Sequence, residues 1–233
     1  MADYEKIYKE TYIIKEGEGP GKVYMYLLVG SKRAALIDSG YGNLQLKDIC
    51  SMVTNLPVNL LLTHGHFDHV GGVNEFDDLW ISSQDKQLLI DTVGNVKGNI
   101  HNISDGQTFD LGGRTIKAIL VPGHTKGCMA FLDVENRTLF SGDVCCKADV
   151  LLNFPESESV DVYMDSLRKL IALGDSYDYN YPSHHSIPVG KENLRDIEIC
   201  GNRILSGEYQ PGECEMIGMT FRKMEYKDIA IIY

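Results

Sequence analysis

The chain of 233 residues is long enough to bury a sizeable core, and it carries 22 Lys and Arg against 33 Asp and Glu. The resulting net charge of −11 argues against nucleic acid or an anionic membrane as a partner. No apolar run approaches the length of a membrane span. The charged segment MADYEKIYKETY at residues 1–12 lacks the apolar core of a signal peptide, and the six cysteines form no CxxC pair. We therefore expect a cytoplasmic protein with reduced cysteines and, since no linker composition interrupts the chain, one domain over residues 1–233.

The first quarter of the chain predicts strands followed by a helix. Residues 11–15 predict a strand, and residues 22–30 and 33–40 predict a β-hairpin with a short turn. Apolar residues then recur at i, i+3, i+4 and i+7 from Leu46, which is one face of a helix over residues 43–53.

The middle of the chain alternates strand and helix. Residues 58–64, VNLLLTH, predict a buried strand that ends at His64. Ser82 to Val93 predict a helix, because Ser82 and Asp85 have capping-box spacing and a glycine follows Val93. Residues 115–125, TIKAILVPGHT, predict a further strand that ends at His124.

The second half continues the alternation. Residues 128–134 and 137–143 predict a hairpin whose second strand ends at Asp143. An apolar stripe from Val160 to Ile171 predicts a helix. The remaining elements are a short strand over residues 177–185 that ends at His184, a helix over residues 193–206 and a strand-like tail over residues 219–233.

One pattern recurs along these elements. Four apolar or aromatic segments each run into a histidine or an aspartate: LLLTH, ILVPGH, TLFSGD and YNYPSH. Strands of layered α/β folds present their ends along a common edge, and ligands collect there. Residues that are far apart in the sequence are therefore expected to converge at one site.

The segment HGHFDH at residues 64–69 indicates a metal site. Side chains two residues apart on an extended chain point the same way, so His64 and His66 can face one ion, and Asp68 and His69 follow where the chain bends. Neutral imidazole and carboxylate are ligands for zinc, iron or manganese. A solvated histidine-rich loop is the alternative, but three histidines and an aspartate within six residues favour a metal site.

The motif HGHFDH, followed by PGHT at 122–125, SGD at 141–143 and PSH at 182–184, resembles the metallo-β-lactamase superfamily. This resemblance implies an α/β fold, a four-layer αββα sandwich with two sheets face to face and helices outside. It also implies two divalent metal ions at one edge, zinc first, with iron or manganese as alternatives. The ligands that it implies are His64, His66 and His124 for one ion, Asp68, His69 and His184 for the other, and Asp143 between both.

The chemistry that the resemblance implies is hydrolysis. Two divalent ions that share a water molecule lower its pKa, and the resulting hydroxide attacks an electrophilic carbonyl or phosphorus. We therefore expect a metal-dependent hydrolase of a small ester, thioester, lactone or amide. Asp68 is the expected catalytic residue, because its carboxylate can orient the hydroxide and carry a proton to the leaving group.

Two positions close to these ligands have two interpretations each. His185 adjoins His184, and the P-x-H pattern favours His184 as the ligand, with His185 facing a ligand or the substrate. Asp38 either accepts a hydrogen bond from a ligand histidine or the loop backbone, or it only shapes the turn before Gly40.

Three further features have a functional and a structural interpretation. Cys145 and Cys146 lie near the metals or only fill a strand end, and the second is slightly favoured. The segment Lys147–Ser159 either lines the pocket and sets specificity or is a long surface loop. Tyr24 and Tyr26 either wall the pocket or pack in a core.

Other functions on the same fold are weighed against this hypothesis. An iron-dependent oxidoreductase of the sulfur-oxygenase type has overlapping ligands and is the main alternative. A scaffold without catalysis disagrees with the complete ligand set. A true β-lactamase is not expected, because such enzymes usually carry an export signal and lack an aspartate like Asp143. Glyoxalase-II-like thioesterases share PGHTKG, although their basic tail is not evident here, and lactonases usually have a tyrosine where Cys145 and Cys146 stand. The substrate is a small molecule of open identity, and the oligomeric state stays open.

Overall fold

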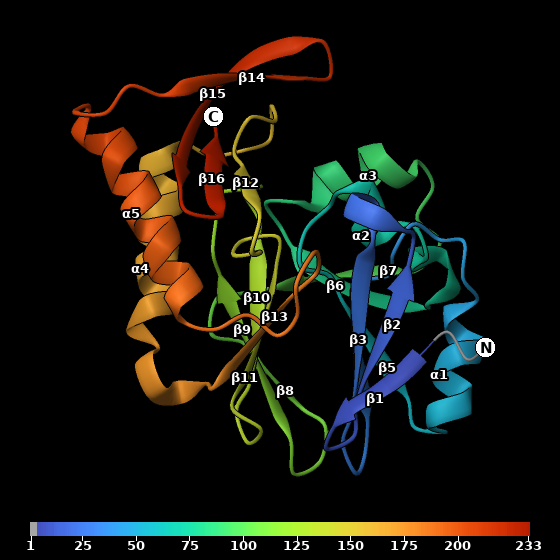
Figure 1. Ribbon diagram of the computed structural model, residues 1–233. Coiled ribbons are helices and arrows are strands. Elements are labelled where there is room, and N and C mark those ends of the chain that lie inside the picture. Colours follow the sequence, from blue (N-terminus) through green and yellow to red (C-terminus); the bar gives the residue numbers. More distant parts are fainter. Residues whose placement is uncertain (1–3) are drawn as a thin grey trace.

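Two β-sheets pack face to face, and helices cover their outer faces (Figure 1). This computed structural model describes residues 4–233, so residues 1–3 of the expected domain lie outside the described part. The expected four-layer αββα sandwich is confirmed, with one addition. A third, smaller sheet formed mainly by the C-terminal residues packs beside the second sheet.

The first sheet has seven strands in sequence order, antiparallel from β1 to β4 and parallel from β4 to β7. The predicted hairpin over residues 22–40 is confirmed, because β3 and β4 pair antiparallel with Leu28 opposite Ala35. The strands are β1 (Tyr4–Tyr8), β2 (Thr11–Glu16), β3 (Val23–Val29), β4 (Ala34–Ile37), β5 (Val58–Leu61), β6 (Asp78–Ser82) and β7 (Asn99–Ile103).

The second sheet has the order β13-β11-β10-β9-β8, and the third has the order β12-β16-β15-β14. The strands of the second sheet are β8 (Thr108–Asp110), β9 (Thr115–Leu120), β10 (Met129–Asp133), β11 (Thr138–Gly142) and β13 (Tyr179–Pro182). Those of the third are β12 (Asp149–Leu151), β14 (Gly212–Met216), β15 (Met219–Tyr226) and β16 (Ile229–Ile232). The helices are α1 (Leu46–Val53), α2 (Phe67–Val70), α3 (Lys86–Val93), α4 (Val160–Ala172) and α5 (Glu192–Ser206).

The central strands are buried on both faces, as a four-layer sandwich requires. Along β3, Met25 and Leu27 face the helices α1 to α3, whereas Tyr26 and Leu28 face the second sheet. The core between the two sheets is aromatic, and the ring centroids of Tyr26 and Phe140 lie 4.9 Å apart. Tyr26 is therefore a core residue and not a wall of the pocket.

The strand ends meet at one edge, as the sequence pattern predicts. Strands β9 and β11 both run antiparallel to β10, and β13 runs parallel to β11, so all three end on the same side. The strands nevertheless stop short of the predicted residues. Strand β5 ends at Leu61 and not at His64, and β9 ends at Leu120 and not at His124. Most side chains at this edge thus come from loops, whose backbone can turn them inward.

The predicted helix over residues 82–93 begins only at Lys86, and its capping box does not form. Asp85 is the residue before the helix, and its side chain makes no capping hydrogen bond. Its carboxylate instead accepts hydrogen bonds from two loops at the sheet edge. The capping prediction is therefore wrong, because a tertiary contact outcompetes the local one.

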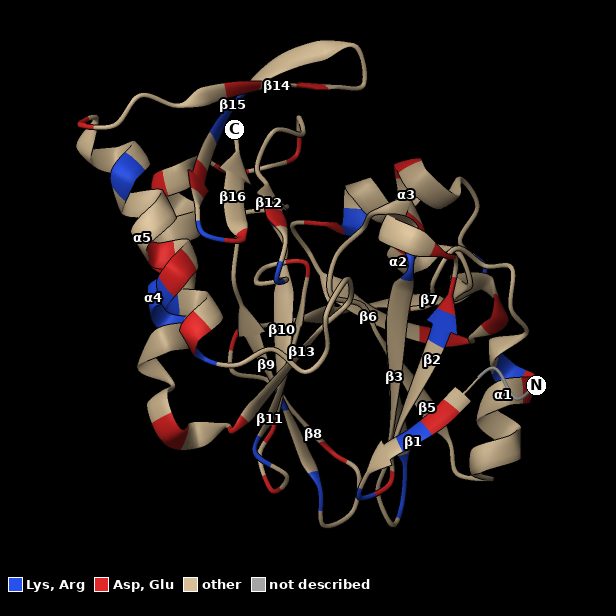
Figure 2. Cartoon of the chain, in the orientation of Figure 1, with Lys and Arg blue, Asp and Glu red and all other residues tan. Residues whose placement is uncertain are grey.

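Charged side chains of both signs are interspersed along the outer helices α4 and α5 (Figure 2). Within residues 4–233, no helix combines the length and the apolar character needed to cross a membrane.

Candidate metal centre

The loop between β5 and α2 carries His64 and His66, and α2 itself carries Asp68 and His69. Close packing shapes this loop, because a Cβ atom at Gly65 would lie 2.9 Å from the Leu88 side chain and 2.9 Å from the Leu89 backbone nitrogen. The backbone N–H of His69 donates to the carbonyl of His66 at 2.9 Å, which starts the short helix α2. The sequence HGHFDH thus turns its polar side chains toward one point while its glycine lies against α3.

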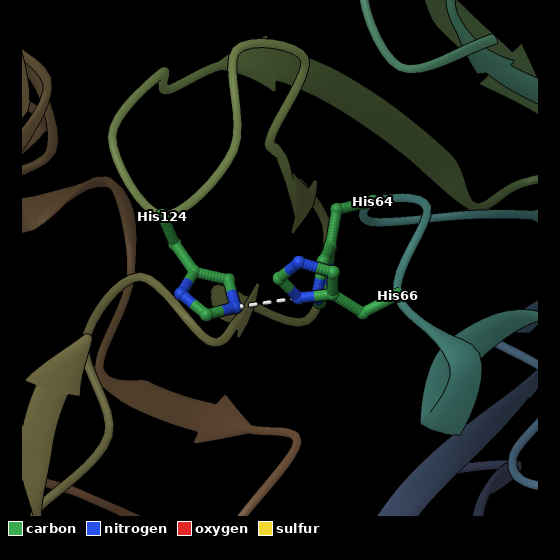
Figure 3. Close-up of side chains that lie close together, drawn as sticks. All are labelled: His64, His66 and His124. Atoms are coloured by element: carbon green, nitrogen blue, oxygen red, sulfur yellow. Dashed lines mark hydrogen bonds between the residues drawn. The ribbon is translucent and has the colours of Figure 1, made fainter. Parts of the chain in front are cut away.

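Three imidazole nitrogens converge from two loops (Figure 3). Nδ1 of His66 lies 3.0 Å from Nε2 of His64 and 2.9 Å from Nε2 of His124. His124 follows β9 and is 58 residues away from His66 in the sequence. Three ring nitrogens at such spacing can hold one divalent cation.

The opposite ring nitrogens of these histidines all face acceptors. Nδ1 of His124 lies 2.8 Å from the carbonyl oxygen of Leu151, and Nε2 of His66 lies 2.7 Å from Oε1 of Glu156. Nδ1 of His64 lies 3.0 Å from the hydroxyl oxygen of Thr63. An acceptor at one nitrogen fixes the proton there, so the lone pair of the other nitrogen points into the centre.

A second group lies beside the first. Nε2 of His184 is 3.4 Å from Nε2 of His69 and 3.3 Å from Oδ2 of Asp68. Here too the outer nitrogens face acceptors: Nδ1 of His69 donates to Oδ2 of Asp38, and Nδ1 of His184 donates to the carbonyl of Lys22, each at 2.8 Å. This group can hold a second cation.

Asp143 lies between the two groups. Its Oδ2 is 3.7 Å from Nε2 of His124 and 3.5 Å from Nε2 of His184, and its Oδ1 is 3.4 Å from Nε2 of His69. Within residues 4–233, buried Oδ1 has no hydrogen-bond partner. A buried carboxylate oxygen without a donor is costly unless a cation compensates it, and the position between the groups suits a shared ligand.

The electrostatics of the two groups differ. Burial, reinforced by neighbouring imidazoles, lowers the pKa of His64 well below 6.5, and burial lowers the pKa of His124 to about 4. Both rings are therefore neutral at pH 7, as ligands must be. Burial also opposes protonation of His69, but the surrounding carboxylates, Asp143 first, outweigh burial and raise its pKa well above 6.5. The second group thus concentrates negative charge that attracts a cation.

The residues present fit two divalent cations on chemical grounds. Five histidine nitrogens point inward with their partners fixed on the outer side, and two carboxylates supply negative charge. Imidazole nitrogen and carboxylate oxygen are the ligands that zinc, iron and manganese share. The centre brings together all seven residues that the sequence predicted: His64, His66, Asp68, His69, His124, Asp143 and His184.

The outer support of the centre includes two buried aspartates. Oδ1 of Asp38 accepts the backbone N–H of Thr63 at 2.7 Å, while its Oδ2 contacts His69. Asp38 also has a φ of 62°, so it both shapes the turn and orients His69. Asp85 accepts hydrogen bonds from the Gly65 N–H and the Thr125 hydroxyl, at 3.1 and 2.6 Å. Asp85 therefore joins the two loops that carry the first group.

A cavity of about 190 Å³ opens onto the centre. Its lining includes side chains of both groups, together with Asp149 and Leu151 from β12. A larger cavity of about 540 Å³ is lined by residues of α1, β5 and β6, but none of the seven convergent residues lines it. The smaller cavity is thus the one where a ligand can meet the candidate metal centre.

Several predicted neighbours fall at the rim or outside the centre. His185 lines the cavity but belongs to neither ligand group, and Cys146 is buried at the cavity wall. Burial, together with the charge of Asp143, raises the pKa of Cys146 well above 9, so its thiol is protonated at pH 7. His101, the one histidine of the chain outside this region, is exposed, stacks on Trp80 and takes no part in the centre.

Sequence reasoning did not find the roles of Glu156 and Asp85. Glu156 lies in the segment Lys147–Ser159, for which lining of the pocket was one interpretation, yet nothing in its local spacing indicates a histidine partner 90 residues earlier. Asp85 carries a visible local signal, the capping-box spacing, which pointed to a different role.

The fold and this arrangement of histidines and aspartates define an α/β protein with a cluster of side chains that can hold metal. The sequence profile of the metallo-beta-lactamase superfamily matches residues 19–184. The chain therefore belongs to the metallo-beta-lactamase superfamily, and the resemblance seen in its motifs is confirmed.

Curated relatives share the same region. The chain is 34% identical over 182 residues to the lactamase-like protein nscB of Trichophyton equinum, covering 73% of this chain and 51% of that protein. It is 29% identical over 180 residues to an atrochrysone carboxyl ACP thioesterase of Aspergillus fumigatus, covering 73% of this chain and 55% of that protein. The chain thus spans about half the length of the curated relatives it matches.

Solved structures show the same fold at low identity. A metallo-beta-lactamase family protein of Thermus thermophilus aligns with a TM-score of 0.69 at 19% identity, over 87% of this chain and 82% of that one. A metallo-beta-lactamase of Pontibacter korlensis aligns with a TM-score of 0.70 at 18% identity, over 85% of this chain and 98% of that one. These likenesses confirm the predicted fold class.

Proposed function

We propose that the protein is a metal-dependent hydrolase that cleaves a thioester, or a related small ester, lactone or amide, at the candidate metal centre. The observation that carries this proposal is the convergence of five histidines and two aspartates beside a cavity. Among the carbonyl substrates, a thioester has additional support. Two relatives at 29 and 30% identity are named atrochrysone carboxyl ACP thioesterases.

Seven residues of this chain would hold two divalent cations, with zinc as the first candidate. His64, His66 and His124 form one site, Asp68, His69 and His184 form the other, and Asp143 serves both. When bound, such a pair of ions polarises a carbonyl oxygen and lowers the pKa of a water molecule. Every outer contact described above keeps the ligand nitrogens aimed at these positions.

Asp68 is the residue that we assign to proton transfer. Its side chain is 16% exposed and lines the cavity, with Oδ2 3.3 Å from Nε2 of His184 and Oδ1 3.7 Å from Nε2 of His69. In thioester hydrolysis, water adds to the carbonyl carbon and the carbon–sulfur bond breaks. Asp68 accepts a proton from the water and delivers it to the leaving sulfur, so the products are a carboxylic acid and a thiol.

The experiment is an assay of the zinc-loaded protein on a panel of thioesters, esters, lactones, amides and phosphodiesters. We expect turnover of a carbonyl substrate, thioesters foremost, and a loss of about 10²- to 10⁴-fold in kcat for Asp68→Asn. Asp91→Asn is the matched control, because Asp91 lies on the exposed side of α3 and its side chain contacts Gln87.

Two results would contradict the proposal. Hydrolysis by Asp68→Asn at the rate of the unaltered protein would remove Asp68 from proton transfer. Oxygen uptake by iron-loaded protein, without hydrolysis of any carbonyl substrate, would show that the protein is an iron-dependent oxidoreductase that uses the same ligands.

A further inference from the structure

The segment Lys147–Ser159 wraps around the first histidine group and not only around the cavity. Oε1 of Glu156 accepts the Nε2–H of His66 at 2.7 Å, and the carbonyl of Leu151 accepts the Nδ1–H of His124 at 2.8 Å. The hydroxyl of Ser157 donates to the carbonyl oxygen of His124, also at 2.8 Å. Two of the three histidines in this group are thus held from outside by one stretch of chain.

An aromatic contact strengthens the same arrangement. The ring centroid of Phe154 lies 5.1 Å from that of His66 and 5.7 Å from that of His124, and both contacts are edge-on. Edge-on packing restricts rotation of the imidazoles. The segment therefore limits the orientation of both rings.

The segment is anchored at both ends by other parts of the fold. Strand β12 pairs in parallel with β16 of the C-terminal sheet (Figure 1), and the Leu152 N–H donates to the carbonyl of Ile232 at 2.8 Å. At its other end the segment leads into α4, which begins at Val160. Glu156 lies between these anchors, so its contact with His66 depends on the path of the whole segment.

We propose that Glu156 is a positioning residue for the metal site formed by His64, His66 and His124, and that ion binding there orders the segment Lys147–Ser159. This inference rests on the metal site of the proposed function. A carboxylate on the outer nitrogen of a ligand histidine fixes its tautomer and strengthens the ligand. Because binding and ordering are linked, each favours the other by the same factor.

The proposal is specific to one of the two metal positions. Within residues 4–233, the side chain of Glu156 bonds to His66 and to no residue of the second group. The second group takes its outer support from Asp38 and the Lys22 carbonyl. Loss of Glu156 is therefore expected to weaken the binding of one ion and to leave the binding of the other unchanged.

The first experiment compares zinc retention in the unaltered protein, Glu156→Ala, Glu156→Gln and Glu158→Gln under titration with a chelator. Glu156→Ala should bind one of two zinc ions about 10- to 100-fold more weakly, while the other ion is retained. Glu156→Gln should show a smaller loss, because its amide oxygen still accepts the hydrogen bond without the charge. Glu158→Gln is the matched control, since within residues 4–233 its side chain makes no hydrogen bond or ion pair and only its backbone N–H bonds to Gly123.

The second experiment measures amide hydrogen exchange with and without zinc. In the unaltered protein, zinc should slow exchange over residues 151–158, and in Glu156→Ala this protection should be reduced. A structural role alone would raise exchange equally with and without zinc and would leave the zinc affinity of the folded protein unchanged.

The outcomes separate this inference from the proposed function. Absence of zinc binding in the unaltered protein would contradict the metal site and therefore both proposals. Unaltered protein that binds two zinc ions, with equal affinities in Glu156→Ala and Glu158→Gln, would overturn the role of Glu156 alone. Equally weakened binding of both ions in Glu156→Ala would contradict the assignment of Glu156 to one metal position.

Discussion

The carboxylate of Asp38 accepts a hydrogen bond from Nδ1 of His69 at 2.8 Å, and both side chains are fully buried. The two residues come from different elements, because Asp38 follows β4 and His69 lies in α2. The contact leaves Nε2 of His69 free to face Asp143 and Asp68. Asp38 thus orients a candidate metal ligand from outside the centre.

Asp38→Asn should weaken zinc binding at the second metal position, the one assigned to Asp68, His69 and His184. Asparagine tolerates the positive φ of 62° at this position, so the backbone needs no change. However, one of its two side-chain atoms becomes a donor that faces the donors of Thr63 and His69. We expect zinc affinity at this position to fall about 10- to 100-fold and metal-free stability to fall by about 1–3 kcal/mol, measured by chelator titration and urea unfolding.

Asp78→Asn is the matched control for this change. Asp78 also accepts a hydrogen bond from a histidine, His101, at 2.7 Å, but both side chains are exposed. Its replacement should change stability by less than about 1 kcal/mol and leave zinc affinity unchanged. Equal effects of the two substitutions would contradict the role of Asp38.

Asp85→Asn should loosen the two loops that carry the first histidine group. The carboxylate of Asp85 accepts the N–H groups of Gly65 and Gly127 and the hydroxyl of Thr125. An amide at this position leaves one of these donors unpaired, at a cost of about 1–3 kcal/mol. We expect this loss in urea unfolding, together with weaker zinc binding.

Ser82→Ala separates this role from helix capping. If Asp85 acted with Ser82 in a capping box, both substitutions would destabilise α3 alike. The Ser82 hydroxyl accepts a long contact of 3.3 Å from the Gln84 N–H, so we expect Ser82→Ala to cost less than about 1 kcal/mol. A larger loss in Ser82→Ala than in Asp85→Asn would restore the capping interpretation.

Arg114→Ala should destabilise the fold without changing the centre. Its guanidinium is buried and donates two hydrogen bonds to Asp133, at 2.6 and 2.9 Å. A third hydrogen bond, 2.9 Å long, goes to the carbonyl of Glu10. These contacts join the two sheets at the edge opposite the centre. Removing one partner of a buried pair costs about 3–5 kcal/mol. The expected result is a lower urea midpoint with unchanged zinc affinity in the folded protein.

The exposed pair of Arg137 and Asp178 supplies the control. Its two hydrogen bonds are each 2.8 Å long, between the 2.6 and 2.9 Å of the buried pair, but about half of each side chain is exposed. Arg137→Ala should therefore cost less than about 1 kcal/mol. Similar losses for Arg114→Ala and Arg137→Ala would show that burial does not set the strength of these pairs.

The sequence predicted that these side chains converge, because most of them follow strands. Strand ends meet at an edge, so the strand pattern alone was enough to group His124, Asp143 and His184 with the HGHFDH segment. The layered fold followed from the same alternation of strands and helices. How these residues would divide between two metal positions is implied by the family resemblance and stays a prediction.

The supporting residues were harder to predict because their partners are distant in the sequence. Glu156 meets His66 across 90 residues, and Asp85 meets Gly127 across 42. Local patterns predict helices, turns and caps, but they do not predict which loop a buried carboxylate contacts. At Asp85 the local pattern even pointed to a different partner, and the tertiary contact prevailed.

The measurement that tests the central claim most directly is the metal content of the purified, unaltered protein. Seven convergent side chains, with Asp143 between two groups, predict about two divalent metal ions per chain after mild purification or after zinc loading and desalting. A content of one ion, or of none, under both conditions would contradict the dinuclear centre.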